Sequence, residues 1–156
     1  MRLSLTFKAF TVLLLAVLIW GCPLKLRDKN SGDDKDRKGA VELAVNTVVT
    51  DDLNGVKGDH TDWKVFSLPE DGGFTLKLGT DNPDVEMKVK LRDHFGEIIK
   101  EFDHKKGETM EVWGPFGAKK EKYFLEISVG DLSGSVYSIK VDFKAQSVIE
   151  NVPSPE

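Results

Sequence analysis

The stretch YFLEISVGDLSGSVYSIKVDFK, residues 123–144, alternates apolar and polar side chains on both sides of a glycine-containing turn. Every second residue is apolar in 123–129, and the same period returns in 137–143. Side chains of a β-strand point alternately to its two faces, so this pattern is typical of strands that are buried on one face only. The stretch therefore predicts two antiparallel strands joined by a tight turn around Gly134.

The same period of two fills the chain from about residue 40 onward. Further runs lie in 40–51, 62–68, 74–78, 85–91, 96–102 and 107–116. Turn signals separate them: Asn54-Gly55, Glu70–Gly73, Asp81–Asp84, Asp93–Gly96 and Lys105–Gly107. Seven to eight short strands at this spacing predict an all-β, antiparallel β-sandwich, jelly-roll-like in outline, over residues 40–144.

The N-terminal residues 1–21 have the composition of an export signal. Arg2 and Lys8 precede an apolar run, Ala9–Gly21, that is shorter than the roughly 20 residues of a transmembrane helix. The run ends in LIWGC, residues 18–22, which resembles the lipobox of bacterial lipoproteins, although Trp20 is larger than the residue usual there. The alternative is an uncleaved signal anchor with an unmodified thiol.

The lipoprotein resemblance implies that Cys22, the only cysteine, is acylated and becomes the first residue of the mature chain. Acyl chains hold a protein on a membrane by burying their CH₂ groups. The next residue is Pro23 rather than the aspartate that resembles an inner-membrane retention signal. We therefore expect a protein of the bacterial cell envelope that is anchored through Cys22 to the outer membrane, on a face that the sequence does not specify.

The segments that flank the predicted sandwich are polar. Residues 22–39 mix charged residues, Ser and Gly and predict a disordered tether, while residues 145–156 predict a flexible tail. Loss of Arg2 and Lys8 with the signal changes the net charge from −4 to −6. An acidic chain without clustered Lys and Arg excludes nucleic acid as the expected partner.

Three stretches carry a resemblance to the bacterial pre-peptidase C-terminal (PPC) domain. They are DWKVFSLPEDGGFTLKL at 62–78, VEMKVKLRDHFGEII at 85–99 and YFLEISVGDLSGSVYSIKV at 123–141. The first has an aspartate-aromatic strand and a glycine turn, the second a central hairpin, and the third a closing pair of strands. The resemblance implies a small β-sandwich that is appended to secreted peptidases or stands alone, and some such domains bind calcium near the start of the sandwich.

Catalytic patterns are not recognisable in the sequence. The histidines His60, His94 and His104 each follow an aspartate, but neighbours in a strand point to opposite faces, and all three lie in or beside predicted turns. Neither a nucleophile elbow nor a zinc-protease motif is present. We therefore expect a protein that is not an enzyme, and the alternative is a hydrolase with an unrecognised site.

Two groups of residues are candidates for binding. Calcium is the only cofactor considered, because it prefers oxygen ligands and one predicted loop contains several of them. These candidate ligands are Asp51, Asp52, Asn54, Asp59 and Asp62. The competing interpretation is that they shape two ordinary turns. Three aromatic residues, Trp63, Trp113 and Phe116, are candidates to stack on a sugar or a peptide, or else to pack in the core.

The function expected from these patterns is that of a lipid-anchored binding or interaction module of the envelope. Its partner would be an envelope protein or a polysaccharide, in addition to the membrane contacted through Cys22. The alternatives are a hydrolase, a peptidase-accessory protein and a purely structural envelope lipoprotein.

Overall fold

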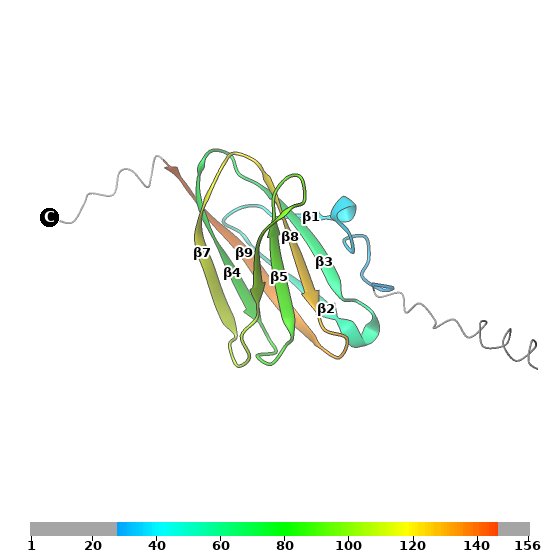
Figure 1. Ribbon diagram of the computed structural model, residues 1–156. Helices are drawn as coiled ribbons and strands as arrows, with labels where there is room; N and C mark the ends of the chain where they lie inside the picture. Colours follow the sequence, from blue (N-terminus) through cyan, green and yellow to red (C-terminus); the bar gives the residue numbers. More distant parts are fainter. Residues whose placement is uncertain (1–27, 147–156) are drawn as a thin grey trace, which may run out of the picture.

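The computed structural model describes residues 28–146, which form a sandwich of two twisted β-sheets (Figure 1). The predicted signal peptide, the lipidation site Cys22 and most of the predicted tail lie outside these residues. The strands are β1 (Val41–Glu42), β2 (Val48–Asn54), β3 (Thr61–Ser67), β4 (Gly72–Thr80), β5 (Met87–Arg92), β6 (Ile98–Asp103), β7 (Met110–Ala118), β8 (Lys122–Val129) and β9 (Gly134–Ala145). Two short 3₁₀ helices, η1 (Arg37–Gly39) and η2 (Gly55–Lys57), complete the elements.

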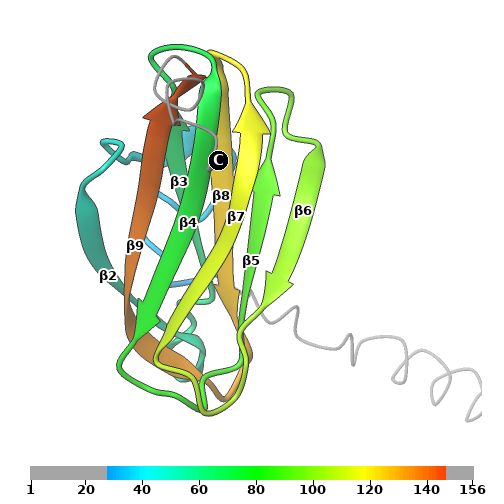
Figure 2. The ribbon, with the colours of Figure 1, turned by 90° about the vertical axis from the view of Figure 1, so that its left-hand side faces the viewer.

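The two sheets have five and four strands. The five-stranded sheet has the order β1-β3-β8-β5-β6, and the four-stranded sheet has the order β2-β9-β4-β7 (Figure 2). All neighbours pair antiparallel except β1 and β3, which are parallel. The predicted all-β sandwich is therefore confirmed.

The strand count exceeds the predicted seven to eight because the expected strand at 40–51 is divided. Asn46 adopts a left-handed conformation with φ of 65°. Its N–H donates to Val141 O at 2.7 Å. The chain therefore leaves the five-stranded sheet after β1 and enters the four-stranded sheet as β2.

The core follows the period of two on which the prediction rested. In β8 the exposure alternates along the strand, and Leu125 and Ile127 are fully buried. Buried side chains of β3, β4, β5 and β9 meet them from both sheets. Phe66, Phe74 and Tyr123 pack together there, with ring centroids 5.3 to 5.8 Å apart.

Residues 28–40 form a strap that packs on the five-stranded sheet, so 28–39 is not the disordered segment that the sequence predicted there, and residues 22–27 of the predicted tether lie outside the described residues. Ser31 is buried within this strap. The Trp63 N–H donates to Asp34 O at 2.7 Å, and the Asp36 side chain caps η1. Sequence composition missed the strap because polar contacts hold it, and apolar burial contributes little.

We predict that Leu125→Ala lowers the free energy of unfolding by about 2–5 kcal/mol, because it leaves a cavity at a position that is fully buried. The matched control is Leu132→Ala, since Leu132 is 92% exposed and its loss should change stability by less than about 0.5 kcal/mol. Urea denaturation of a chain that starts after Cys22 measures both. Equal effects of the two variants would contradict the assigned core.

Candidate functional site

Lys64 lies in the interior of the sandwich with none of its side chain exposed. The alternation of β3 puts it on the same face as Asp62 and Phe66, which are also buried. The sequence contained this signal. The apolar Phe66 and Leu68 are two residues apart in 62–68, and the same period places residue 64 on their face.

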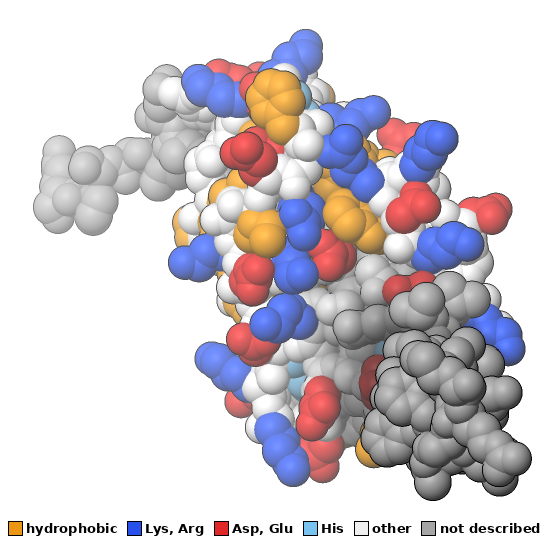
Figure 3. Space-filling model, turned by 45° about the vertical axis from the view of Figure 1, so that its right-hand side comes forward, with side chains coloured by type: hydrophobic (Ala, Val, Ile, Leu, Met, Phe, Trp, Pro, Cys, Tyr) orange, Lys and Arg blue, Asp and Glu red, His pale blue; other side chains and the backbone are white. Residues whose placement is uncertain are grey.

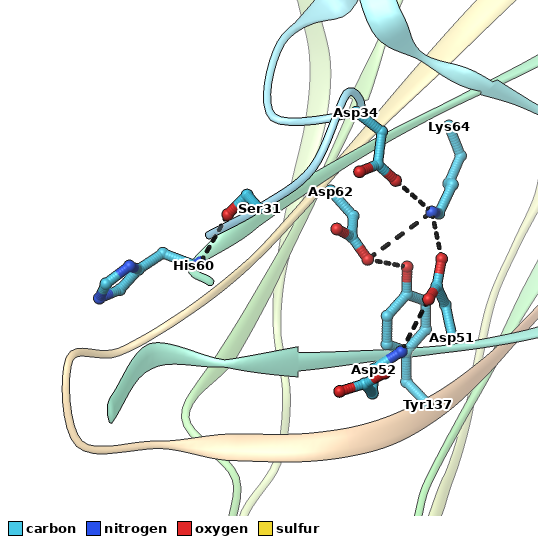
Figure 4. A network of polar contacts seen from close by, with 8 residues as sticks. All are labelled: Ser31, Asp34, Asp51, Asp52, His60, Asp62, Lys64 and Tyr137. Carbon is cyan, nitrogen blue, oxygen red and sulfur yellow. Dashed lines mark hydrogen bonds and ion pairs between the residues drawn. The ribbon is translucent and has the colours of Figure 1, made fainter. Parts of the chain in front are cut away.

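Carboxylates from three separate segments surround the Lys64 ammonium (Figure 4). The Nζ atom lies 2.6 Å from Asp34 Oδ2 in the strap and 2.5 Å from Asp51 Oδ2 in β2. A longer contact of 3.6 Å reaches Asp62 Oδ2, which also accepts a 2.6 Å hydrogen bond from the Tyr137 hydroxyl. We call these five residues the Lys64 cluster.

The surroundings of the Lys64 cluster shift the pKa values of Asp62 and Lys64. Burial raises the pKa of Asp62 to about 7, although the Tyr137 hydrogen bond and the Lys64 charge act in the opposite direction. Burial opposes the charge on Lys64, but its hydrogen bonds with Asp34 and Asp51 outweigh this effect and raise its pKa. Lys64 therefore stays charged, and Asp62 is the group that titrates near neutral pH.

The predicted calcium ligands do not all meet at one point. Asp51 and Asp62 lie in the Lys64 cluster, where oxygens of Asp34, Asp51 and Asp62 are within 4.8 Å of one another. Asp52 is exposed, since its side chain follows Asp51 on β2 and points to the other face. Calcium binding therefore stays a prediction, and a cation at this carboxylate group would have to replace the Lys64 ammonium.

The other two predicted ligands have local structural roles. The Asn54 side chain accepts a hydrogen bond from Lys57 N at 3.2 Å and caps η2. Asp59 pairs with Asn54 through backbone hydrogen bonds in both directions. The competing interpretation expected two turns, whereas Asn54 and Asp59 flank a single turn that contains η2.

Each of the three histidines contacts a carboxylate. His60 Nε2 lies 3.2 Å from Asp131 Oδ1, and His94 Nδ1 lies 3.0 Å from Glu121 Oε2. His104 is buried between Glu111 and Pro83 O. None of these carboxylates is the aspartate that precedes the histidine in sequence.

The three candidate aromatic residues pack against the protein. Trp113 stacks on Phe102 at 4.5 Å between centroids, and Phe116 contacts Phe74 at 5.4 Å, so these rings close the sandwich between β6 and β7. Trp63 is half-buried on the outer face of the five-stranded sheet, with the Arg92 guanidinium 5.3 Å above its ring. Arg92 also pairs with Glu126 at 2.5 Å.

The outer faces of the two sheets differ in character. Charged side chains cover the side that carries the strap, where hydrophobic groups are small and separate (Figure 3). The four-stranded sheet instead exposes four apolar side chains on its outer face, and we call this surface the open face: Val48, Met110, Val112 and Val136. Their exposed fractions range from 45% to 59%.

A groove of about 620 Å³ extends across the same sheet. Gly73, Thr75 and Pro115 form part of its lining, and Lys77 and Asp142 stand at one side. Asp142 contacts both Lys77 and Lys140 at 2.5 Å. The open face is thus a continuous surface with apolar patches, a shallow hollow and a compact ion-pair group.

No family model matches the chain, and no curated protein is similar to it. Among solved structures, the chain is similar to the pre-peptidase C-terminal domain of a collagenase from Bacillus anthracis. The two are 20% identical with a TM-score of 0.54, over 66% of this chain and 94% of that domain.

The domain has the fold of a PPC domain. This confirms the fold that the sequence resemblance implied. The Yersinia pseudotuberculosis-derived mitogen is less similar, with 14% identity and a TM-score of 0.47 over 63% of this chain and 85% of that one. Within the described residues of the PPC-like domain, we find no helix that is long and apolar enough to cross a membrane.

We predict that Asp62→Asn becomes more stabilising as the pH rises from about 4 to about 8. The folded state raises the pKa of Asp62 from 3.8 to about 7, so it retains a proton that the unfolded chain releases. The stability from this group is therefore lost as the pH rises through that window. An amide cannot ionise, so the difference between variant and parent should grow by at most about 4 kcal/mol, measured by urea denaturation at several pH values.

The matched control is Asp142→Asn, which should lower the free energy of unfolding at neutral pH, the opposite of the effect expected for Asp62→Asn. Lys140 and Lys77 lower the pKa of Asp142, so its ionised form stabilises the fold at neutral pH and its loss is unfavourable there. Parallel stability curves for the Asp62→Asn variant and the parent would contradict the assignment.

Proposed function

We propose that this chain is a non-catalytic binding module of the bacterial cell envelope, anchored through acylated Cys22, which holds another envelope protein on its open face. The PPC-like sandwich is compatible with a binding module. The observation that supports the proposal most is the asymmetry of the two sheets. The strap and a network of ion pairs cover the central strands of the five-stranded sheet, whose exposed aliphatic side chains lie on its edge strands β1 and β6. The open face exposes Val136 on a central strand, β9, in addition to Met110 and Val112 on β7.

The character of the open face favours a protein partner over a polysaccharide. Sugar recognition commonly uses exposed aromatic rings, and the three rings singled out from sequence pack against Phe102, Phe74 and Arg92. The open face instead combines aliphatic side chains, most of them on the edge strands β2 and β7, with the ion-pair group Lys77, Lys140 and Asp142 on the central strands β4 and β9. A surface that mixes apolar and charged side chains is typical of protein interfaces.

The geometry of the ionisable groups supports a non-catalytic role. Lys64 has no exposed side-chain surface, so its ammonium cannot meet a substrate in solution. His104 is 1% exposed and contacts Glu111 at 2.9 Å. These groups have the burial and the partners of structural ion pairs, and we propose no reaction for them.

We predict that Cys22→Ser releases the protein from the membrane fraction, because the serine cannot receive the acyl chains that hold the chain on the bilayer. Cell fractionation with immunodetection measures the distribution. The mass of the N-terminal peptide of the parent, which should carry the acyl chains, is the control. A Cys22→Ser protein that stays wholly in the membrane fraction would contradict the anchor.

We predict that Met110→Glu combined with Val112→Glu abolishes capture of the partner while leaving the domain folded. Both side chains are more than half exposed, so the substitutions place charge in the interface without burying it in the domain. Capture from detergent-solubilised envelope, followed by mass spectrometry, identifies proteins that bind the parent and not the variant.

The matched control for the open face is Phe95→Glu, since Phe95 is 73% exposed but lies in the β5–β6 turn, outside that face. It should capture the same proteins as the parent. Identical captures by all three chains would refute the open face as the binding surface. A secreted peptidase among the open-face-dependent proteins would make the module a peptidase accessory.

A further inference from the structure

The strap begins at one end of the sandwich, which we call the strap end, and runs along the five-stranded sheet to the β5–β6 turn, where the Arg37 side chain donates to Phe95 O. Four connections lie there: residues 55–60, 81–86, 104–109 and 130–133. The His60 N–H donates to Asp28 Oδ1 at 3.2 Å and to Ser31 Oγ at 3.1 Å. The Asn30 N–H donates to Gly58 O at 2.9 Å. The chain therefore reaches the strap end at Asp28, the first residue that the structure describes.

The strap end also carries the most exposed apolar side chain of residues 28–146. Leu132 is 92% exposed in the β8–β9 turn, and Val56 is 71% exposed in η2. Their two connections touch, because Gly55 N donates to Ser133 O at 2.9 Å. Val56 and Leu132 line one shallow hollow, so they form a paired apolar tip.

The same tip is adjacent to the point where the strap begins. The side chain of His60 contacts Asp131, the neighbour of Leu132, while its backbone binds Asp28. On the other side, the Asn30 side chain donates to the carbonyl of Lys57, the neighbour of Val56. The first residues of the strap therefore contact the chain next to both members of the tip.

Only five residues, 23–27, separate Cys22 from Asp28. A chain advances at most about 3.6 Å per residue, so this segment spans at most about 20 Å. Strand β9 has twelve residues, and at about 3.3 Å each the sandwich is roughly 40 Å long. With Cys22 at the membrane surface, the strap end is the end that the short segment holds near the lipid.

We infer that the strap end is a membrane-contacting surface, in which Val56 and Leu132 enter the interface of the bilayer that holds the acyl chains. This inference rests on the proposed anchor at Cys22. The docked strap shortens the tether, so the acyl chains keep the tip at a high local concentration next to lipid. Burial of the two side chains then fixes the orientation of the domain, with the β5–β6 turn directed away from the membrane.

Charge does not provide the attraction. Lys57 lies beside Val56, but Asp84, Glu86 and Asp131 surround the same hollow, so an anionic lipid surface gains little from this end. Two aliphatic side chains that project from acidic loops are suited to shallow insertion that depends on the anchor. The soluble domain without acyl chains should accordingly show no affinity for vesicles.

The test uses the complete acylated lipoprotein, reconstituted into vesicles of phosphatidylethanolamine and phosphatidylglycerol. Acylation occupies the only cysteine, so Leu132→Cys or Phe95→Cys introduces a single free thiol for an environment-sensitive fluorophore. Both positions are highly exposed and tolerate the label. Lipids that carry a nitroxide in the acyl chain quench the fluorophore only at contact with the bilayer.

We expect quenching at position 132 to be several-fold stronger than at position 95, and quenching at position 56 in Val56→Cys to match that at 132. Asp28→Ala with Ser31→Ala releases the first contacts of the strap and lengthens the tether. In that background, quenching at position 132 should fall toward the value at position 95.

Equal quenching at positions 132 and 95 in acylated protein would overturn the inference and leave the anchor intact. A mass that shows unmodified Cys22 would instead overturn the anchor, and the inference with it. Shielding of position 132 that requires an added envelope protein, and is absent with lipid alone, would assign the tip to a protein interface and overturn the membrane contact.

Discussion

The fold depends on one buried ammonium. Lys64 occupies a core position of β3, and transfer of a charge into an apolar interior is strongly unfavourable unless carboxylates and hydrogen bonds compensate it. The compensation comes from other parts of the chain: Asp34 from the strap, Asp51 from β2, and Asp62 from β3 itself. Since β2 belongs to the opposite sheet, the Lys64 cluster connects both sheets and the strap at one point.

This connection explains why a polar segment is ordered. The strap offers little apolar surface to bury, so specific polar contacts must offset the conformational entropy that is lost when it becomes ordered. Asp34 provides one of them, 2.6 Å from the Lys64 ammonium, which has no access to water. The position of Lys64 in the core therefore helps to fix where the strap packs, and under the proposed anchor at Cys22 it limits how far the sandwich can lie from the membrane.

Much of the fold was readable from the sequence, because alternation and turn residues act locally. The strands at 123–129 and 137–143 formed as β8 and β9. They do not pair with each other as a tight turn at Gly134 would require, because the connection at 130–133 crosses from the five-stranded to the four-stranded sheet. The strap and the Lys64 cluster were missed for a different reason. Their contacts join residues 13 and 30 positions apart, and a lysine at an apolar position looks like a solvent-facing residue until its partners are known. The carboxylates Asp51 and Asp62 were noticed, but the roles considered for them were calcium binding and turn formation, and an internal lysine was not considered.

The candidate calcium loop and the Lys64 cluster are two solutions to the same electrostatic problem. Three carboxylates within 4.8 Å of one another repel strongly and need a positive charge between them. A metal ion would make the fold depend on an external concentration, whereas a lysine on β3 is always present. One ammonium cannot neutralise three carboxylates, and part of the excess is relieved by protonation, because burial raises the pKa of Asp62 to about 7. The Tyr137 hydroxyl donates to Asp62 and stabilises its ionised form, which only partly offsets this effect. The chain thus carries its own cation, and the remaining imbalance makes its stability depend on pH where a metal site would make it depend on the ion.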